Sequence, residues 1–254
     1  MRNIFDLSGK IAIVVGGGSG LGMGMSTGLA QAGATVIVAG RRKDVLIHTQ
    51  KEIENQGGTC IPMTLDITSF DSIHSFLEEI DNRYGRVDIV VNSAGINIRK
   101  PALDFELNDW DKVTDTQQKY VFFTCKEVGR YMVDHGIKGR IINMASLSSM
   151  LGLKNMVAYC ASKGAIAQIT KALANEWAPY GITVNAIAPG YFLTDMTKPL
   201  LSDPEIAMQY EKRIPVGRLG TPEDLMSTVI YLACDASAYV TGQIIYVDGG
   251  WTIN

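Results

Sequence analysis

Short apolar runs alternate with amphipathic stretches along nearly the whole chain. The first run, I-A-I-V-V at residues 11–15, has no polar alternation, which is typical of a strand buried on both faces of a parallel sheet. Similar runs predict further strands at residues 35–39, 60–64, 87–91, 139–145, 183–188 and 244–247. The alternation therefore predicts one α/β domain over residues 1–254, a doubly wound parallel sheet of about seven strands flanked by helices.

The stretches between these runs predict the helices. Ser69 is a suitable N-cap for a helix ending near Tyr84, and T-P-E-D at residues 221–224 is a strong helix start. Further helices are expected from the glycine run to Ala32 and over residues 43–56, 108–135 and 158–180. Residues 190–215 follow no regular pattern, and insertions of this length are often functional. We expect an irregular lid over a substrate site there.

A glycine-rich turn, G-G-G-S-G-L-G at residues 16–22, follows the first strand directly and leads into a helix. Glycines let the backbone turn sharply and approach a diphosphate, whose charge is favoured at a helix N-terminus. A merely flexible turn is the alternative. The strand before it and the helix after it favour a dinucleotide site.

Two arginines, Arg41 and Arg42, follow the second strand. In NAD-binding units this place holds an acidic residue that binds the ribose hydroxyls. A guanidinium group suits a 2′-phosphate instead, so the sequence favours NADP over NAD. Two ordinary surface arginines are the alternative interpretation.

The composition narrows the range of partners. The net charge is −3, and 46% of the residues are hydrophobic, which is typical of a globular protein with a large core and gives no indication of nucleic-acid binding. We expect no membrane span, because no apolar run has the necessary length, and no secretory signal. The four cysteines and three histidines show no metal-binding spacing, so we expect no metal and a reduced, cytoplasmic protein.

A hydroxyl, a phenol and an amine occur close together between residues 146 and 163. On a helix, Tyr159 and Lys163 lie four residues apart on one face, and a nearby ammonium should lower the pKa of the phenol. Such a tyrosine can exchange protons near neutral pH. Ser146, at the end of the fifth predicted strand, could bind a substrate oxygen.

These motifs together resemble the short-chain dehydrogenase/reductase family in its form of about 250 residues. The resemblance extends along nearly the whole chain. It consists of G-x-x-x-G-x-G from Gly16, N-S-A-G from Asn92, Ser146, Y-x-x-x-K from Tyr159 and P-G-x-x-x-T from Pro189, in family order and spacing. It implies a Rossmann-type fold, a nicotinamide cofactor and usually a homotetramer.

The resemblance also implies roles for individual residues. Tyr159 would be the catalytic acid and base, Lys163 would lower its pKa and hold the nicotinamide ribose, and Ser146 would orient the substrate oxygen. The remaining cofactor-binding residues would be Gly16, Gly18, Ser19, Gly20, Leu21, Asp66, Ile67, Asn92, Ala94, Gly95, Pro189, Gly190, Leu193 and Thr194, joined by Arg41 and Arg42.

Two positions depart from the family pattern. Val15 stands where a threonine usually precedes the first glycine. Gln117, in T-Q-Q, stands where the fourth catalytic residue is usually the asparagine of a V-N-L-like run. Gln117 keeps the amide but is one methylene longer, so we expect a displaced or altered proton relay through Lys163.

Three further stretches, at residues 28–33, 190–196 and 242–251, resemble the sugar-acid branch of the family, the gluconate 5-dehydrogenases and 2-deoxy-gluconate 3-dehydrogenases. Their substrates are polyhydroxylated acids, so a cation near the pocket is expected. The candidate substrate-binding residues are Arg99, Ser148, Lys154, Tyr191, Met196 and Trp251. For Arg99 and Lys154, a solvated loop position is the alternative.

The sequence thus leads to three functional hypotheses. The first is an NAD(P)-dependent oxidoreductase that interconverts a secondary alcohol and a ketone on a small polyol or sugar-acid-like substrate. The second is a reductase of 3-oxoacyl thioesters on a carrier protein, since the family includes such enzymes. The third is a nucleotide-sensing binding protein with impaired catalysis, suggested by Val15 and Gln117.

Overall fold

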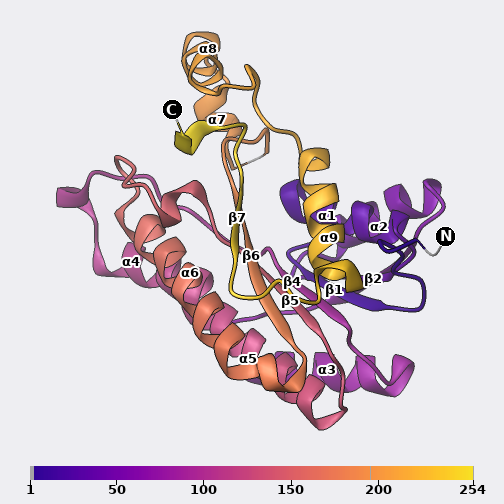
Figure 1. The fold of residues 1–254 in the computed structure, drawn as a ribbon. Helices are drawn as coiled ribbons and strands as arrows, with labels where there is room; N and C mark the ends of the chain where they lie inside the picture. Colours follow the sequence, from indigo (N-terminus) through magenta and orange to yellow (C-terminus); the bar gives the residue numbers. More distant parts are fainter. Residues whose placement is uncertain (1–2, 195, 254) are drawn as a thin grey trace.

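A seven-stranded, entirely parallel sheet forms the centre of the molecule (Figure 1). The computed structural model describes residues 3–194 and 196–253. The strand order is β3-β2-β1-β4-β5-β6-β7, and the expected fold class is confirmed. The strands are β1 (Ile11–Val15), β2 (Thr35–Gly40), β3 (Thr59–Thr64), β4 (Ile89–Asn92), β5 (Arg140–Met144), β6 (Thr183–Pro189) and β7 (Ile244–Val247).

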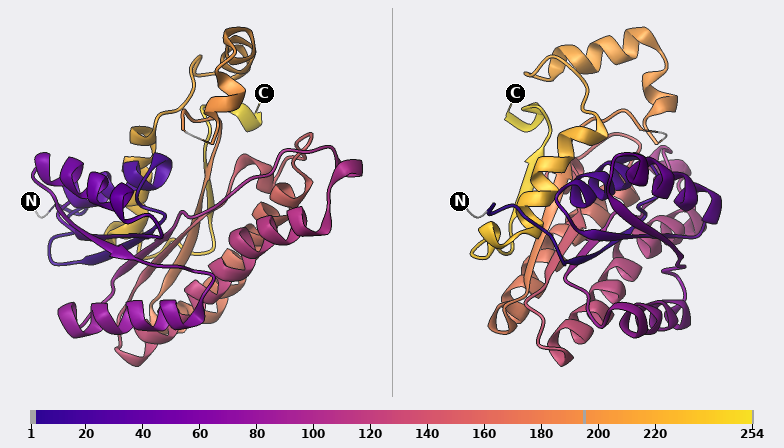
Figure 2. Two further views of the ribbon diagram at one scale, coloured as in Figure 1. Left: turned by 180° about the vertical axis from the view of Figure 1, so that it is seen from behind. Right: turned by 90° about the vertical axis from the view of Figure 1, so that its right-hand side faces the viewer.

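Helices cover both faces of the sheet (Figure 2). One layer contains α1 (Gly20–Gln31), α2 (Lys43–Asn55) and α9 (Met226–Ala233), and the other contains α3 (Phe70–Tyr84), α5 (Tyr120–Asp134) and α6 (Val157–Trp177). Because successive strand residues point to opposite faces, Ile13 packs toward the second layer and Val14 toward the first. This burial on both faces explains the uninterrupted apolar runs.

The chain reverses its direction of winding between β1 and β4. Strand β1 pairs with β2 on one side, where Val15 is the partner of Ala39, and with β4 on the other, where Val15 is the partner of Asn92. In open α/β sheets, ligands bind at the carboxyl ends of the strands beside such a switch point. The fold therefore directs the glycine turn after β1 and the N-S-A-G segment after β4 toward one crevice.

Three helical predictions need correction. The segment at 190–215 is not irregular, because it contains α7 (Lys198–Leu201) and α8 (Pro204–Arg213), with Asp203 capping α8. The helix expected at 108–135 is divided into α4 (Leu107–Thr114) and α5 by a π-helical turn at Asp115–Lys119. Helix α6 ends at Trp177, where Pro179 directs the chain into a 3-10 turn.

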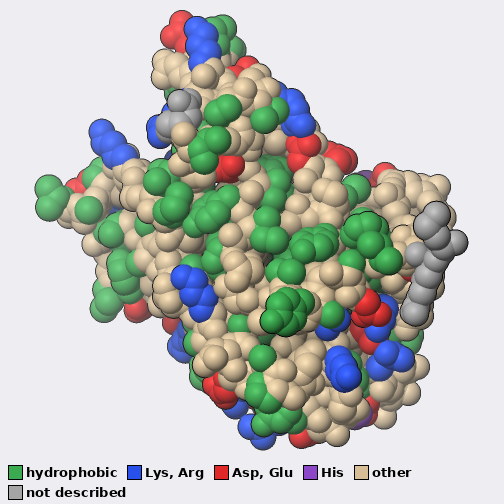
Figure 3. All heavy atoms as spheres, viewed as in Figure 1, with side chains coloured by type: hydrophobic (Ala, Val, Ile, Leu, Met, Phe, Trp, Pro, Cys, Tyr) green, Lys and Arg blue, Asp and Glu red, His purple; other side chains and the backbone are tan. Residues whose placement is uncertain are grey.

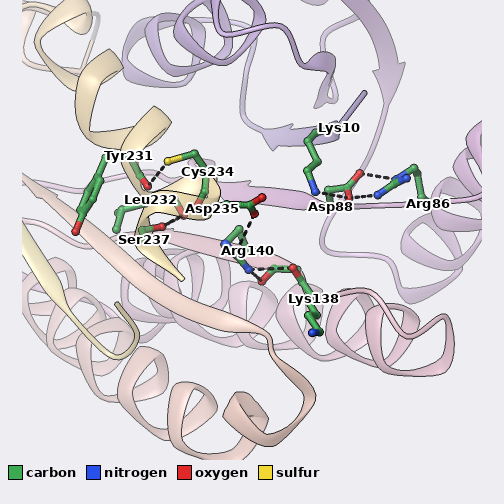
Figure 4. Close-up of polar contacts among 11 residues, drawn as sticks. Lys10, Arg86, Asp88, Lys138, Arg140, Tyr231, Leu232, Cys234, Asp235 and Ser237 are labelled. Atoms are coloured by element: carbon green, nitrogen blue, oxygen red, sulfur yellow. Dashed lines mark hydrogen bonds and ion pairs between the residues drawn. The ribbon is translucent and has the colours of Figure 1, made fainter. Parts of the chain in front are cut away.

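Charged side chains hold the amino ends of the strands together, opposite the crevice (Figure 4). The buried carboxylate of Asp88 accepts hydrogen bonds from the Ile11 N–H (2.9 Å) and from Arg86 Nε (2.8 Å). Arg140, the first residue of β5, donates to the carbonyl oxygens of Lys138 and Gly139 and reaches Asp235. These contacts involve no crevice residue, so we interpret them as structural.

No helix within the described residues is both long and apolar enough to cross a membrane.

Candidate active site

A cavity of about 380 Å³ opens at the carboxyl ends of the strands. Its walls come from the glycine turn after β1, the arginines after β2, the segment after β4, the π-helical turn, α6 and the start of the insertion after β6. Of the predicted residues, its lining includes Gly16, Gly18, Ser19, Gly20, Leu21, Arg41, Arg42, Asp66, Ile67, Ala94, Gly95, Gln117, Ser146, Tyr159, Lys163, Pro189, Gly190, Thr194 and Met196. Residues far apart in the sequence thus share one site.

Two glycines of the turn after β1, Gly16 and Gly22, have no room for a side chain. Gly16 has φ +78°, and a Cβ there would lie 2.6 Å from the Ala94 nitrogen. A Cβ on Gly22 would lie 2.1 Å from the Gly16 carbonyl oxygen. Helix α1 starts at Gly20, so its unpaired N–H groups face the cavity beside this close-packed backbone. These features fit the diphosphate of a dinucleotide cofactor.

The two arginines follow β2 directly. Arg41 and Arg42 are exposed and belong to its lining. Nearby, hydrogen bonds from Thr68 hold the pKa of Asp66 below its usual value, so this carboxylate is charged at neutral pH. Its position with Ile67 in the lining suits contact with the base of a nucleotide.

Tyr159 and Lys163 lie one turn apart on α6, and Lys163 Nζ is 5.5 Å from the centre of the Tyr159 ring. Ser146 follows β5, and its hydroxyl is hydrogen-bonded to Tyr159. Lys163 is 5% exposed, and its Nζ donates a 2.6 Å hydrogen bond to the Met144 carbonyl oxygen. The three expected groups therefore form one cluster.

The expected lowering of the Tyr159 pKa is wrong for the protein alone. Burial raises that pKa, and this effect exceeds the opposing effects of the Ser146 hydrogen bond and the positive charge of Arg99. Burial also lowers the pKa of Lys163, from 10.5 to about 7. The sequence showed the spacing of the two groups, but it could not show how strongly the fold desolvates them.

Ser149, which the sequence analysis did not single out, joins two of these groups. Its hydroxyl accepts a hydrogen bond from the Ser146 N–H (3.2 Å) and donates one to the Lys163 carbonyl oxygen (2.8 Å). It thereby fixes the backbone at Ser146 relative to α6. The serine-rich run S-L-S-S was the only local indication of this role in the sequence. It did not show which of its hydroxyl groups would contact the Ser146 N–H or the Lys163 carbonyl oxygen.

Gln117 lies in the π-helical turn and is 1% exposed. Its Nε2 donates a 2.6 Å hydrogen bond to the Ile96 carbonyl oxygen, and its Oε1 is buried without a hydrogen-bond partner. The amide lies so close to Gly95 that a Cβ on that glycine would be 2.7 Å from Oε1. Gln117 thus supports the segment that follows β4, and π-helical turns often occur at functional sites.

Several predicted residues do not line the cavity. Asn92 lies beneath it, where its amide donates to Asn143 and Cys125. Leu193 and Lys154 are exposed, and Ser148 is buried with its hydroxyl unpartnered. Tyr191 and Trp251 pack against the insertion. Arg99 is exposed, and its positive charge acts on the phenols of both Tyr159 and Tyr191.

Comparison with known proteins agrees with this geometry. A family profile described as enoyl-(acyl carrier protein) reductase matches residues 16–252. A crystal structure of a short-chain type dehydrogenase/reductase from Mycobacterium marinum is 39% identical and superimposes with a TM-score of 0.94, covering 99% of this chain and 98% of that one. The chain belongs to the short-chain dehydrogenase/reductase family.

Two further members of the short-chain dehydrogenase/reductase family are similar along the whole chain. The 2-dehydro-3-deoxy-D-gluconate 5-dehydrogenase of Bacillus subtilis is 42% identical over 252 residues, covering 99% of this chain and 98% of its own. The structure of a gluconate 5-dehydrogenase from Burkholderia cenocepacia, in complex with NADP and tartrate, is 35% identical with a TM-score of 0.94 and covers 99% of this chain and 98% of its own. The family and the enzyme class expected from the sequence, an NAD(P)-dependent oxidoreductase, are confirmed.

Proposed function

We propose that this short-chain dehydrogenase/reductase interconverts a secondary alcohol and a ketone on a sugar acid. The observation that carries the proposal is the cluster of Ser146, Tyr159 and Lys163 in the cavity lining, with the positive charge of Arg99 acting on the Tyr159 phenol. A guanidinium group whose charge acts on the proposed catalytic tyrosine suits a substrate carboxylate. The relatives named for gluconate and 2-dehydro-3-deoxy-gluconate chemistry support the same substrate class.

The proposed mechanism assigns the proton to Tyr159. In the oxidation direction the phenolate takes the hydroxyl proton of the substrate, and in reduction the phenol returns it to the ketone oxygen. Ser146, already hydrogen-bonded to Tyr159, orients the same oxygen and stabilises its developing charge. The nicotinamide of the bound cofactor would supply or accept the hydride.

Lys163 serves Tyr159 in this mechanism in two ways. When protonated, its buried ammonium near the phenol favours the phenolate electrostatically. Its hydrogen bond to Met144 fixes the amine, and the remaining N–H groups suit the ribose hydroxyls of the cofactor. Gln117 supports the segment after β4 through its hydrogen bond to the Ile96 carbonyl oxygen.

For the cofactor we infer NADP rather than NAD. The support is the pair Arg41 and Arg42 in the cavity lining, because guanidinium groups match a 2′-phosphate in charge and geometry. The NADP in the Burkholderia cenocepacia structure belongs to that protein and is consistent with the inference.

We also propose the homotetramer expected from the sequence. Several large apolar side chains are exposed, among them Leu103, Leu107 and Trp110 near α4 and Tyr239 and Ile253 near β7. Apolar side chains also gather beneath the projecting α7–α8 segment (Figure 3). Contiguous exposed apolar surface is typical of protein interfaces. Sedimentation analysis of the purified protein tests the proposed tetramer.

A cytoplasmic location stays a prediction.

A cofactor-linked absorbance screen of sugar acids, neutral polyols and sulfonated polyols, run with NAD and NADP, tests the proposed function. We expect turnover on a sugar acid that falls about 100-fold or more in Tyr159→Phe. In Arg99→Gln, KM for the sugar acid should rise about 10- to 100-fold, because a charge-assisted hydrogen bond is lost. KM for a neutral polyol should not change.

The control is Lys154→Gln, which removes an exposed loop cation and should leave KM unchanged. Turnover of an acetoacetyl thioester without turnover of any sugar acid would replace the proposal with the thioester reductase. Near-full activity of Tyr159→Phe would refute the assigned chemistry.

A further inference from the structure

The insertion after β6 is attached to the body of the protein through a separate apolar cluster. Its buried members are Leu147, Leu201, Ile214, Leu219 and Trp251. They come from the residue directly after Ser146, from the insertion and its exit, and from the C-terminal segment. The same cluster therefore includes the residue that follows Ser146 and residues of the insertion (190–215), which we call the lid.

Trp251 is the aromatic centre of this cluster. Its ring is 4.6 Å from that of Tyr191 and 5.6 Å from that of Tyr210, with which it stacks at 16°. The guanidinium group of Arg213, the last residue of α8, lies 4.1 Å from the centre of the indole. Trp251 is 4% exposed, so the indole is covered almost completely. Three aromatic residues and one cation thus join the lid to the C-terminal segment.

The backbone around Trp251 is held closely as well. Gly249 (φ +63°) accepts a hydrogen bond from the Val216 N–H, and a Cβ on it would lie 2.6 Å from Ile214. A Cβ on Gly250 would lie 2.9 Å from Pro215. Asp248 accepts hydrogen bonds from the Thr252 N–H and hydroxyl. The C-terminal segment therefore packs closely against residues 214–216, at the end of the insertion.

Tyr191 packs against this cluster, and its chain neighbours Gly190 and Phe192 both line the cavity. Its ring packs edge-on against Tyr210 at 4.4 Å, and the two phenols are hydrogen-bonded. The positive charges of Arg99 and Arg213 both act on its hydroxyl. The charge of Arg99 acts on the phenol of Tyr159 as well. A shift of the cluster would move Tyr191 relative to Arg99.

We propose that Trp251 is a positioning residue that holds the α7–α8 lid against the segment after Ser146, and thereby sets the place of Tyr191 beside the bound substrate. Trp251 acts through Tyr191, Tyr210 and Leu147, not by contact with the reacting atoms. It does not line the cofactor cavity, so we expect cofactor affinity to change little when it is replaced. The effect on substrate rests on the proposed function, whereas the attachment of the lid does not.

Hydrogen exchange of the full chain, measured without substrate, tests the attachment. In Trp251→Leu we expect exchange to rise about tenfold or more in both 204–213 and 147–153, because a factor of ten requires only about 1.4 kcal/mol of lost contact. Trp251→Phe keeps an aromatic ring and should stay within about twofold of the unchanged protein. No change at 147–153 in Trp251→Leu would overturn the proposal.

Trp177→Leu is the matched control, since it removes another nearly buried tryptophan, one that packs on Gly129 far from the lid. It should leave exchange at 204–213 and 147–153 unchanged. An equal rise there in both variants would mean general destabilisation and would also overturn the proposal.

Kinetics test the consequence for substrate. In Trp251→Leu, KM for the sugar acid found in the screen should rise about tenfold while the Kd of NADPH changes less than about twofold, with recovery in Trp251→Phe. Unchanged KM would overturn the positioning of Tyr191. If no sugar acid is turned over by the unchanged protein, the function proposal fails, and the exchange experiment still decides the attachment.

Discussion

Lys163 Nζ donates a 2.6 Å hydrogen bond to the carbonyl oxygen of Met144, the last residue of β5. The bond ties the helix that carries Tyr159 to the strand that leads to Ser146. It also holds an amine at a site where it is only 5% exposed.

The first prediction concerns stability as a function of pH. Burial lowers the pKa of Lys163 from 10.5 to about 7, so between these values the unfolded chain binds more protons at this site than the folded chain. Without cofactor, the stability of the protein should therefore rise with pH from about 7 to 10 relative to Lys163→Met, by at most about 1.4 kcal/mol per pH unit.

Chemical denaturation of both proteins at several pH values across this window measures the difference. Other titrating groups are common to the two proteins and cancel in the comparison. Parallel pH profiles would show that Lys163 keeps its ordinary pKa in the folded chain.

The second prediction concerns the buried amide of Gln117. In Gln117→Leu, the Ile96 carbonyl oxygen loses its donor in a buried site, which costs about 1–3 kcal/mol. Because the adjoining residues line the cofactor cavity, the Kd of NADPH should rise about tenfold. In Gln117→Asn, the shorter side chain should restore affinity only in part.

Fluorescence titration with NADPH measures these constants. Gln118→Leu changes the next residue of the same π-helical turn and serves as the control, with an expected Kd close to that of the unchanged protein. Equal affinities for Gln117→Leu and the unchanged protein would disprove a supporting role for Gln117.

The third prediction concerns cofactor choice. Replacing Arg41 and Arg42 together with alanine should raise KM for NADP about 10- to 100-fold, because charge-assisted hydrogen bonds to the 2′-phosphate are lost. KM for NAD should change less than about twofold, since NAD lacks that group. Steady-state kinetics with both cofactors measure the ratio. Lys43→Ala, an exposed residue outside the cavity lining, is the control, and a clear preference of the unchanged protein for NAD would refute the inference.

The fourth prediction concerns the amino edge of the sheet, far from the site. Asp88→Ala leaves the buried Ile11 N–H without its acceptor, which should lower the free energy of unfolding by about 2 kcal/mol. The Kd of NADPH should not change in this variant. Asp235→Ala removes only a long contact from an exposed carboxylate to Arg140 and should cost less than about 1 kcal/mol. Urea denaturation measures both, and similar losses in the two variants would contradict the structural role assigned to Asp88.

Much of the fold could be predicted because its signals are local. Strands buried on both faces are mostly apolar, and β1 is both apolar and buried at every position. Gly16 and Gly22 cannot carry side chains, because a Cβ would meet the backbone of Ala94 and of Gly16, respectively. Such requirements act on a few neighbouring residues and are therefore visible in the sequence. The helices of the insertion were missed because α7 is a single turn and α8 buries none of its side chains fully, so no apolar stripe marks them.

The candidate site, like the fold, was predictable in some respects and not in others. The sequence by itself determined which chemical groups the protein carries and in what order, including Ser146, Tyr159, Lys163 and the departure at Gln117. Their surroundings depend on the tertiary structure: burial raises the pKa of Tyr159, Gln117 donates a hydrogen bond to the Ile96 carbonyl oxygen, and Trp251 shares an apolar cluster with Leu147 and Leu201. Desolvation and long-range packing depend on residues brought together from distant parts of the chain, so no local pattern records them.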